Sequence, residues 1–212
     1  MKLSHILYKV NDVEEAIKDF EEMGFSICRV GFNPKIWFED ETFIELFKFD
    51  KSNFTIGLTK LIGLRGIGKK FEFFRDSDFG IMEYSLEKDH YDLDPENRLL
   101  KEMGYKYTSI KMKKNDESGV KLKWKITFPY DVNIPFYCAI GNFKELGMPK
   151  EINHKNGARR IEKLVWGVDK KYIDDIKALY DDERLELVEG NGFQEIKIKG
   201  YDGDVFNRKY YK

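Results

Sequence analysis

A histidine and a glutamate interrupt two strand-like apolar runs in the first fifty residues. Strand alternation places His5 on the face of Leu3 and Leu7, and it places Glu45 on the apolar face of the run Thr42–Phe49. A buried carboxylate is costly unless it is paired, protonated or bound to a metal. Imidazole nitrogen with carboxylate oxygen suits Zn, Mn, Fe or Ni. His5 and Glu45 are therefore either metal ligands, with Glu45 also a candidate catalytic base, or a hydrogen-bonded pair on a face that needs no metal.

Four further side chains are candidates for contact with a small molecule. His154 opens the segment His154–Ala158, where it is either a substrate contact or a turn residue ahead of an Asn-Gly pair. Trp37, Trp124 and Tyr137 lie in strand-like runs, where large aromatic side chains line pockets or fill cores. The sequence leaves both interpretations open for each of them.

The composition excludes several classes of partner. Aromatic residues make up 15% of the 212 residues, which favours sheet-rich structure, and 37 basic residues nearly balance 38 acidic ones. With this balance the net charge is too small to attract nucleic acid or an anionic membrane, so we expect neither as a partner. The lysine-rich stretch Lys106–Lys125 is better explained as protection of a strand edge than as a nucleic-acid surface. Two separated cysteines, no apolar signal segment and no bilayer-length apolar run predict a cytoplasmic protein.

The element order repeats along the chain. The first helix is predicted by capping-box spacing at Asn11 or Asp12, and it stops at Gly24. Its exit, Glu22–Phe25, is nearly the same string as Glu102–Tyr105 at the end of the second predicted helix. Because both strings fall at the same place in the same order of elements, we interpret them as an internal repeat.

This repeat divides the chain into five segments. The predicted strands are 3–10, 25–30, 35–39, 42–49, 79–86, 105–112, 120–128, 134–140, 160–168, 183–188 and 193–199, with helices between several of them. The resulting segments are a first βαβββ module at 1–50, a connecting segment or pocket lid at 51–78, a second module at 79–142, a junction and shorter third module at 143–200, and a tail at 201–212. The glycines of the connecting segment do not match a phosphate-binding loop.

The order of elements and a few short motifs resemble the vicinal oxygen chelate superfamily, and most of all its glyoxalase-like group. The opening strand Ser4–Val13, the Ile134–Phe136 strand and the His154–Ala158 junction are similar to motifs of that group. The hairpin from Ser118 to Lys125 is also similar. The resemblance covers about residues 3 to 198, but Gly31–Trp37 lacks the histidine usual at that place.

The resemblance implies an α+β fold in which repeated βαβββ modules form half-open, mostly antiparallel, barrel-like sheets with helices outside. A divalent metal is often held in such a fold by the first and last strands of two modules, where it polarises substrate oxygens. By this placement the third module adds Glu195 as a metal ligand, but it also offers Lys163, which would repel a cation. The second module offers Ile81 and Cys138, so a complete set of four ligands is not visible.

Two functions follow as expectations. The first is a glyoxalase-like protein acting on a small organic substrate in a concave pocket, with metal-assisted lyase, isomerase or dioxygenase chemistry. The alternative is a metal-free protein of the same fold that sequesters a small molecule. We expect a monomer or a homodimer in either case, because paired modules close a barrel within one chain or between two.

Overall fold

The computed structural model describes residues 1–30, 33–115, 121–142, 147–204 and 206. Ser118 and Gly119, with which the expected hairpin begins, and most of the predicted tail lie outside these residues. The fold is mixed α+β with sheets that do not close into barrels, which confirms the predicted class. No helix in the described part of the chain is long and apolar enough to span a membrane.

Residues 1–50 contain the predicted helix and three of the four predicted strands. Asp12 caps the helix, its carboxylate accepting a hydrogen bond from the Glu15 N–H at 2.9 Å, and Gly24 ends it with a φ of 86°. The predicted strand at 25–30 is reduced to one isolated bridge between Cys28 and Lys35. The elements of this module are β1 (Lys2–Lys9), α1 (Val13–Glu22), β2 (Lys35–Trp37) and β3 (Phe43–Phe47).

The connecting segment contains two helices that were not predicted from the sequence. They are α2 (Asn53–Leu61) and α3 (Arg65–Asp76). The glycines that made this segment look irregular are tolerated inside the helices. A Cβ on Gly66 would lie 2.3 Å from the Phe128 carbonyl oxygen, so this glycine lets α3 pack closely against the sheet.

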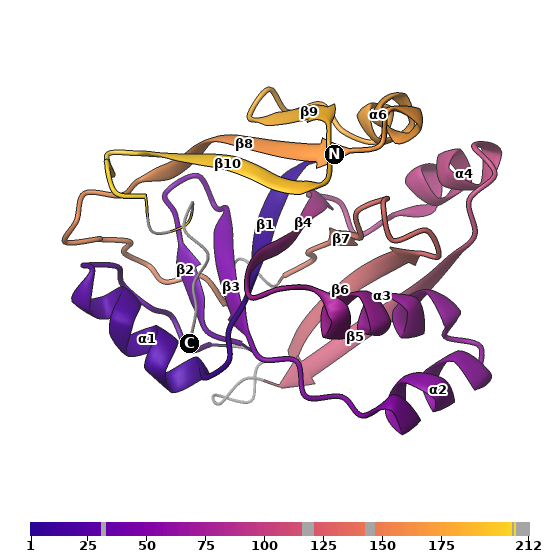
Figure 1. Ribbon diagram of the computed structural model, residues 1–212, viewed down its shortest axis with the longest axis horizontal. Helices are drawn as coiled ribbons and strands as arrows, with labels where there is room; N and C mark the ends of the chain where they lie inside the picture. Colours follow the sequence, from indigo (N-terminus) through magenta and orange to yellow (C-terminus); the bar gives the residue numbers. More distant parts are fainter. Residues whose placement is uncertain (31–32, 116–120, 143–146, 205, 207–212) are drawn as a thin grey trace.

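The second module repeats the first and joins it in one sheet. Its elements are β4 (Gly80–Lys88), α4 (Asp94–Glu102), β5 (Tyr107–Asn115), β6 (Lys121–Pro129) and β7 (Tyr137–Ala139). The seven strands follow the order β2-β3-β1-β4-β7-β6-β5, in which β1 and β4 pair antiparallel. The two modules therefore meet edge to edge through their first strands (Figure 1).

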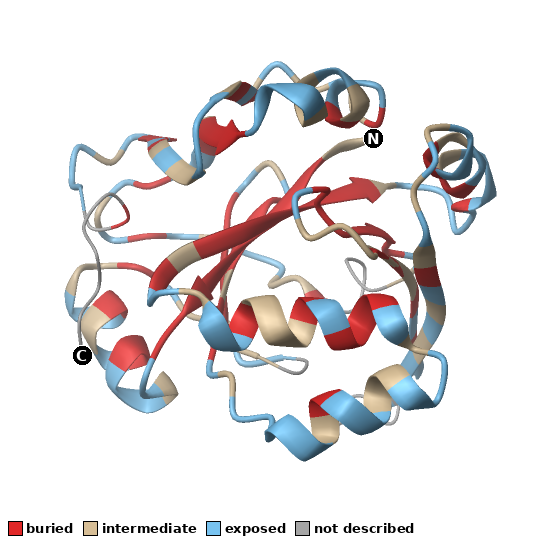
Figure 2. Cartoon of the chain, turned by 45° about the vertical axis from the view of Figure 1, so that its right-hand side comes forward, coloured by how far each residue is buried: buried red, intermediate tan, exposed pale blue. Residues whose placement is uncertain are grey.

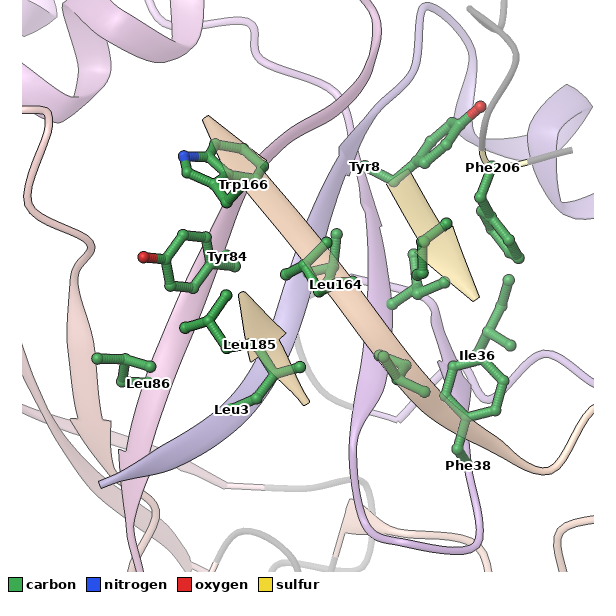
Figure 3. Close-up of a cluster of buried hydrophobic side chains, with 14 of the residues drawn as sticks. Leu3, Tyr8, Ile36, Phe38, Tyr84, Leu86, Leu164, Trp166, Leu185 and Phe206 are labelled. Carbon is green, nitrogen blue, oxygen red and sulfur yellow. The ribbon is translucent and has the colours of Figure 1, made fainter. Parts of the chain in front are cut away.

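The third unit forms a separate small sheet on the convex face of the large one. It consists of β8 (Arg160–Val168), α6 (Lys170–Lys177), β9 (Leu185–Glu189) and β10 (Gly192–Lys199), with β8 in the centre. In Figure 3, Leu164, Trp166 and Leu185 of this unit pack on Leu3 and Tyr84 of the large sheet. The main core therefore lies between the two sheets and under α1, which leaves the concave face of the large sheet free to form a cavity.

A β-bulge turns the first strand so that His5 and Leu3 face opposite sides. On β1, Leu3 is opposite Leu86 and His5 is opposite Ser85, so the intervening Ser4 is the extra residue. Leu3 packs in the core between the sheets, whereas Leu7 packs in a second cluster on the concave side. The prediction that His5 shares a face with Leu3 is wrong, because simple alternation does not hold across a bulge.

A buried ion pair holds α3 against the concave face of the sheet. The fully buried ammonium group of Lys70 contacts the carboxylate of Glu83 on β4, and it donates to the carbonyl oxygens of Val132 and Ile134 at 3.1 and 3.3 Å. Burial raises the pKa of the Glu83 carboxyl, and the charge of Lys70 opposes that rise. This helix lies on the inner side of the sheet, which differs from the expectation that all helices lie outside.

We predict that this ion pair is required for the stability of the α3 contact. Lys70→Met should lower the free energy of unfolding by about 3 kcal/mol, because it leaves a buried carboxylate without its cation. Urea denaturation followed by circular dichroism measures this change. The double variant Lys70→Met/Glu83→Leu should recover part of the loss. A single variant that unfolds at the urea concentration of the unchanged protein would contradict the prediction.

Candidate functional site

A cavity of about 590 Å³ opens on the concave face of the seven-stranded sheet. Its wall is formed by both modules and by α3, and most of the wall is apolar. The aromatic side chains that line it are Phe43, Phe47, Phe49, Phe71, Phe74, Trp124, Phe128 and Phe136. This volume and lining are typical of sites for small organic molecules.

The charged side chains and the amide of the cavity come from the first module and from Lys51, the first residue of the connecting segment. His5 on β1, Lys35 on β2 and Glu45 on β3 face the cavity, and Asn33 and the segment 48–51 lie at its rim. The second module and α3 contribute only apolar side chains, among them the thiol-bearing Cys138. The cavity therefore has one polar side and one apolar side.

His5 is held in place by its neighbours on both sides of the ring. Its imidazole stacks on Phe43 with ring centres 4.5 Å apart and planes within 4°, and Phe136 contacts it edge-on. Its Nδ1 lies 2.9 Å from the hydroxyl of the bulged Ser4. If this hydroxyl donates to Nδ1, the ring proton is on Nε2, the nitrogen that faces Glu45.

Glu45 is anchored through one carboxylate oxygen and leaves the other toward His5. Its Oε1 accepts a hydrogen bond from Asn33 Nδ2 at 2.6 Å, while Oε2 lies 3.8 Å from His5 Nε2. That separation is too long for a direct hydrogen bond. Lys35, opposite Glu45 in the sheet, is buried and donates to the backbone carbonyls of Val30 and Asn33.

The repeat assigns a counterpart in the second module to each of these two residues. Gly24 and Gly104 are 80 residues apart, and the same separation takes His5 to Ser85, which is also its partner in the sheet. Cys138 is opposite Glu87 just as Glu45 is opposite Leu7, so Cys138 is the counterpart of Glu45. The sequence predicted Ile81 as the counterpart of His5 in the second module, but the structure assigns this position to Ser85.

These four positions do not form a metal-binding set. The Ser85 hydroxyl and the Cys138 thiol both hydrogen-bond to the Leu86 carbonyl oxygen, at 3.2 and 3.5 Å. Within the described ranges, no three His, Cys, Asp or Glu side chains are grouped so that they could hold a metal ion. Because a stable site needs at least three protein ligands, His5 and Glu45 alone do not fit a resident metal.

The structure does not bring Glu195 to His5 and Glu45. Glu195 lies on β10 in the small sheet, where it lines a separate cavity of about 300 Å³. Lys163 of the same sheet pairs with Glu186. The third unit therefore supports the convex face of the large sheet and adds no residue to the cavity that contains His5.

Of the predicted substrate contacts, Trp124 lines the cavity. The other three, Trp37, Tyr137 and His154, are not among its lining residues. Trp37 is buried against Phe43, and the Tyr137 hydroxyl bonds to the Asn97 side chain under α4. Sequence reasoning also missed Asn33 and Lys35. The signal for Lys35 was its place in a predicted strand of the same module as Glu45. The phenylalanines of α3 lie in the segment 51–78, which was predicted as a connection or a pocket lid but not as a helix.

His154 is a structural residue of the junction. Its Nδ1 accepts a hydrogen bond from the Ser26 N–H at 2.9 Å, and its Nε2 donates to the Trp37 carbonyl oxygen at 2.8 Å. Both ring nitrogens are thus used in the neutral form, between the rings of Phe25 and Phe38. Burial lowers the pKa of His154 from its ordinary value.

The family model of the glyoxalase-like domain matches residues 3–182. The chain belongs to the glyoxalase-like domain family of the vicinal oxygen chelate superfamily. A crystal structure of a hypothetical protein from Staphylococcus aureus is similar, with a TM-score of 0.61 and 14% identity over 91% of this chain and 88% of that one. This likeness supports the fold alone. A search of curated proteins gives no match.

We predict that the protein loses stability in mild acid through His154. Its folded pKa lies below the unfolded value of about 6.5, so the stabilisation is complete above that pH and is lost as the pH falls through the folded pKa. Urea unfolding between about pH 7.5 and 5 should show a slope with pH that is smaller in His154→Gln. The exposed His90→Gln is the matched control. A His154 ring that titrates above about 6.5 by NMR would contradict the prediction.

Proposed function

We propose that the protein binds a small organic molecule with an aromatic or similarly flat apolar body and a hydroxyl head group, without a resident metal. The observation that carries this proposal is the division of the cavity into one polar side, at His5 and Glu45, and an apolar wall rich in aromatic side chains. An apolar pocket with a few convergent polar groups orients a ligand by its polar end. In this proposal, the cavity on the concave face of the half-open sheet is the binding site.

The gap between His5 and Glu45 supports a hydroxyl as the head group. A hydroxyl both donates and accepts, so it can donate to Glu45 Oε2 and accept from the Nε2–H of His5, atoms that lie 3.8 Å apart. A carboxylate at this position would face the charge of Glu45. The body of the ligand would then lie against Trp124, Ile126 and Phe128 on the apolar side.

A second candidate function is catalysis on the same bound molecule. The proximity of His5 and Glu45 favours it, because a carboxylate within reach of a bound hydroxyl could serve as a general base. Metal-assisted lyase, isomerase or dioxygenase chemistry would need donors beyond these two side chains. We therefore place this candidate second.

We predict that the cavity prefers a hydroxyl over its methyl ether. In isothermal titration calorimetry, 2-naphthol should bind about ten times more tightly than 2-methoxynaphthalene, because the ether cannot donate to Glu45. Glu45→Gln should remove most of this preference. The control Glu186→Gln, in the small sheet, should keep it. Equal affinities for both probes in the unchanged protein would contradict the proposed head group.

The metal content tests the metal-free part of the proposal. Protein purified without chelators should contain far less than one equivalent of Zn, Mn, Fe or Ni, and its affinity for 2-naphthol should not change with EDTA. Stoichiometric metal that is lost in both His5→Ala and Glu45→Ala would overturn the metal-free proposal and favour metal-assisted catalysis.

A further inference from the structure

Helix α2 presents a stripe of large apolar side chains to the solvent. Phe54 is 78% exposed, Leu58 46%, Leu61 83% and Ile62 63%. Their spacing of four, three and one residues puts Phe54, Leu58 and Leu61 on one face of the helix, with Ile62 beside them at its C-cap. Figure 2 shows this largely exposed helix on the outside of α3.

The side of α2 opposite this stripe buries little apolar surface. Ile56 is its only buried residue, and it faces α3. More of the apolar surface of this helix therefore points away from the protein than into it. An exposed apolar patch of this kind marks an interaction site more often than an ordinary surface.

Gly57 borders this stripe beside Phe54 and Leu61, at a position where nothing in the described chain requires a glycine. A Cβ at Gly57 would meet no atom within 4 Å, whereas a Cβ at Gly68 would lie 2.4 Å from Lys60 Cγ. Glycine weakens the interior of a helix, so an unneeded one is unfavourable in the isolated chain. A second helix backbone that crosses at Gly57 would explain it, because small residues allow close helix contacts.

We propose that α2 is the interface between two copies of this chain, packed about a two-fold axis near Gly57. A two-fold interface is self-complementary, as an apolar stripe facing its own copy would be. The four exposed side chains offer on the order of 500 Å² per copy, so a dimer would bury about 1,000 Å², near the lower limit for specific interfaces. The expected dimer is reversible and weak.

A membrane surface fits this stripe less well than a second copy does. Interfacial helices usually carry several basic residues on their polar face. Helix α2 contains one, Lys60, and its ammonium group pairs with Glu72 of α3. A glycine at position 57 would also not strengthen binding to a bilayer, because it adds no apolar side chain.

Sedimentation velocity of the full chain between about 5 and 500 µM tests the proposal. The unchanged protein should shift from monomer to dimer with concentration, while Leu61→Glu and Gly57→Leu should dimerise at least ten times more weakly. Gly57→Leu distinguishes a lost interface from misfolding, because leucine favours the helix and the circular dichroism spectrum should be kept. Val30→Glu, at an exposed apolar residue outside α2, should dimerise normally.

Three results would overturn the proposal. The first is a protein that stays monomeric at 500 µM. The second is a dimer that both α2 variants leave intact. The third is a monomer that floats with phosphatidylglycerol vesicles in a Leu61-dependent way, which would assign the stripe to a bilayer instead.

Discussion

The antiparallel pairing of β1 with β4 places every residue of the cavity relative to the others. It sets His5 opposite Ser85 at the centre of the seven-stranded sheet. The remaining strands of each module extend outward from this pair, so the concave face is built from two similar halves. The bulge at Ser4 then turns His5 inward and gives its ring a hydrogen-bond partner. Without the pairing of β1 with β4, the polar and apolar sides would not face the same cavity.

The modular fold could be predicted from the sequence because its signals are local. The Asp12 cap, the stop at Gly24 and the repeated helix exit depend on adjacent residues. The α2–α3 pair could not be predicted in the same way. Gly66 and Gly68 lower helix propensity, and the contacts that outweigh this cost come from the distant sheet and from Lys60.

The candidate site could be predicted only in part, because some of its features depend on residues that are far apart in the sequence. Strand alternation found His5 and Glu45, but no local pattern shows that a bulge intervenes at Ser4 or that Glu195 belongs to another sheet. His154 stood out as one of three histidines, yet its role in the junction depends on Ser26 and Trp37, which are far away in sequence. Long-range contacts decide which polar residues face the cavity and which are used inside the fold.

A crystal structure of the protein soaked with 2-naphthol tests the central claim most directly. We predict density for the ring against the wall formed by Trp124 and Phe128, with the naphthol oxygen within hydrogen-bond distance of Glu45 Oε2 and His5 Nε2. A metal ion bridging His5 and Glu45, or naphthol bound only outside this cavity, would contradict the account.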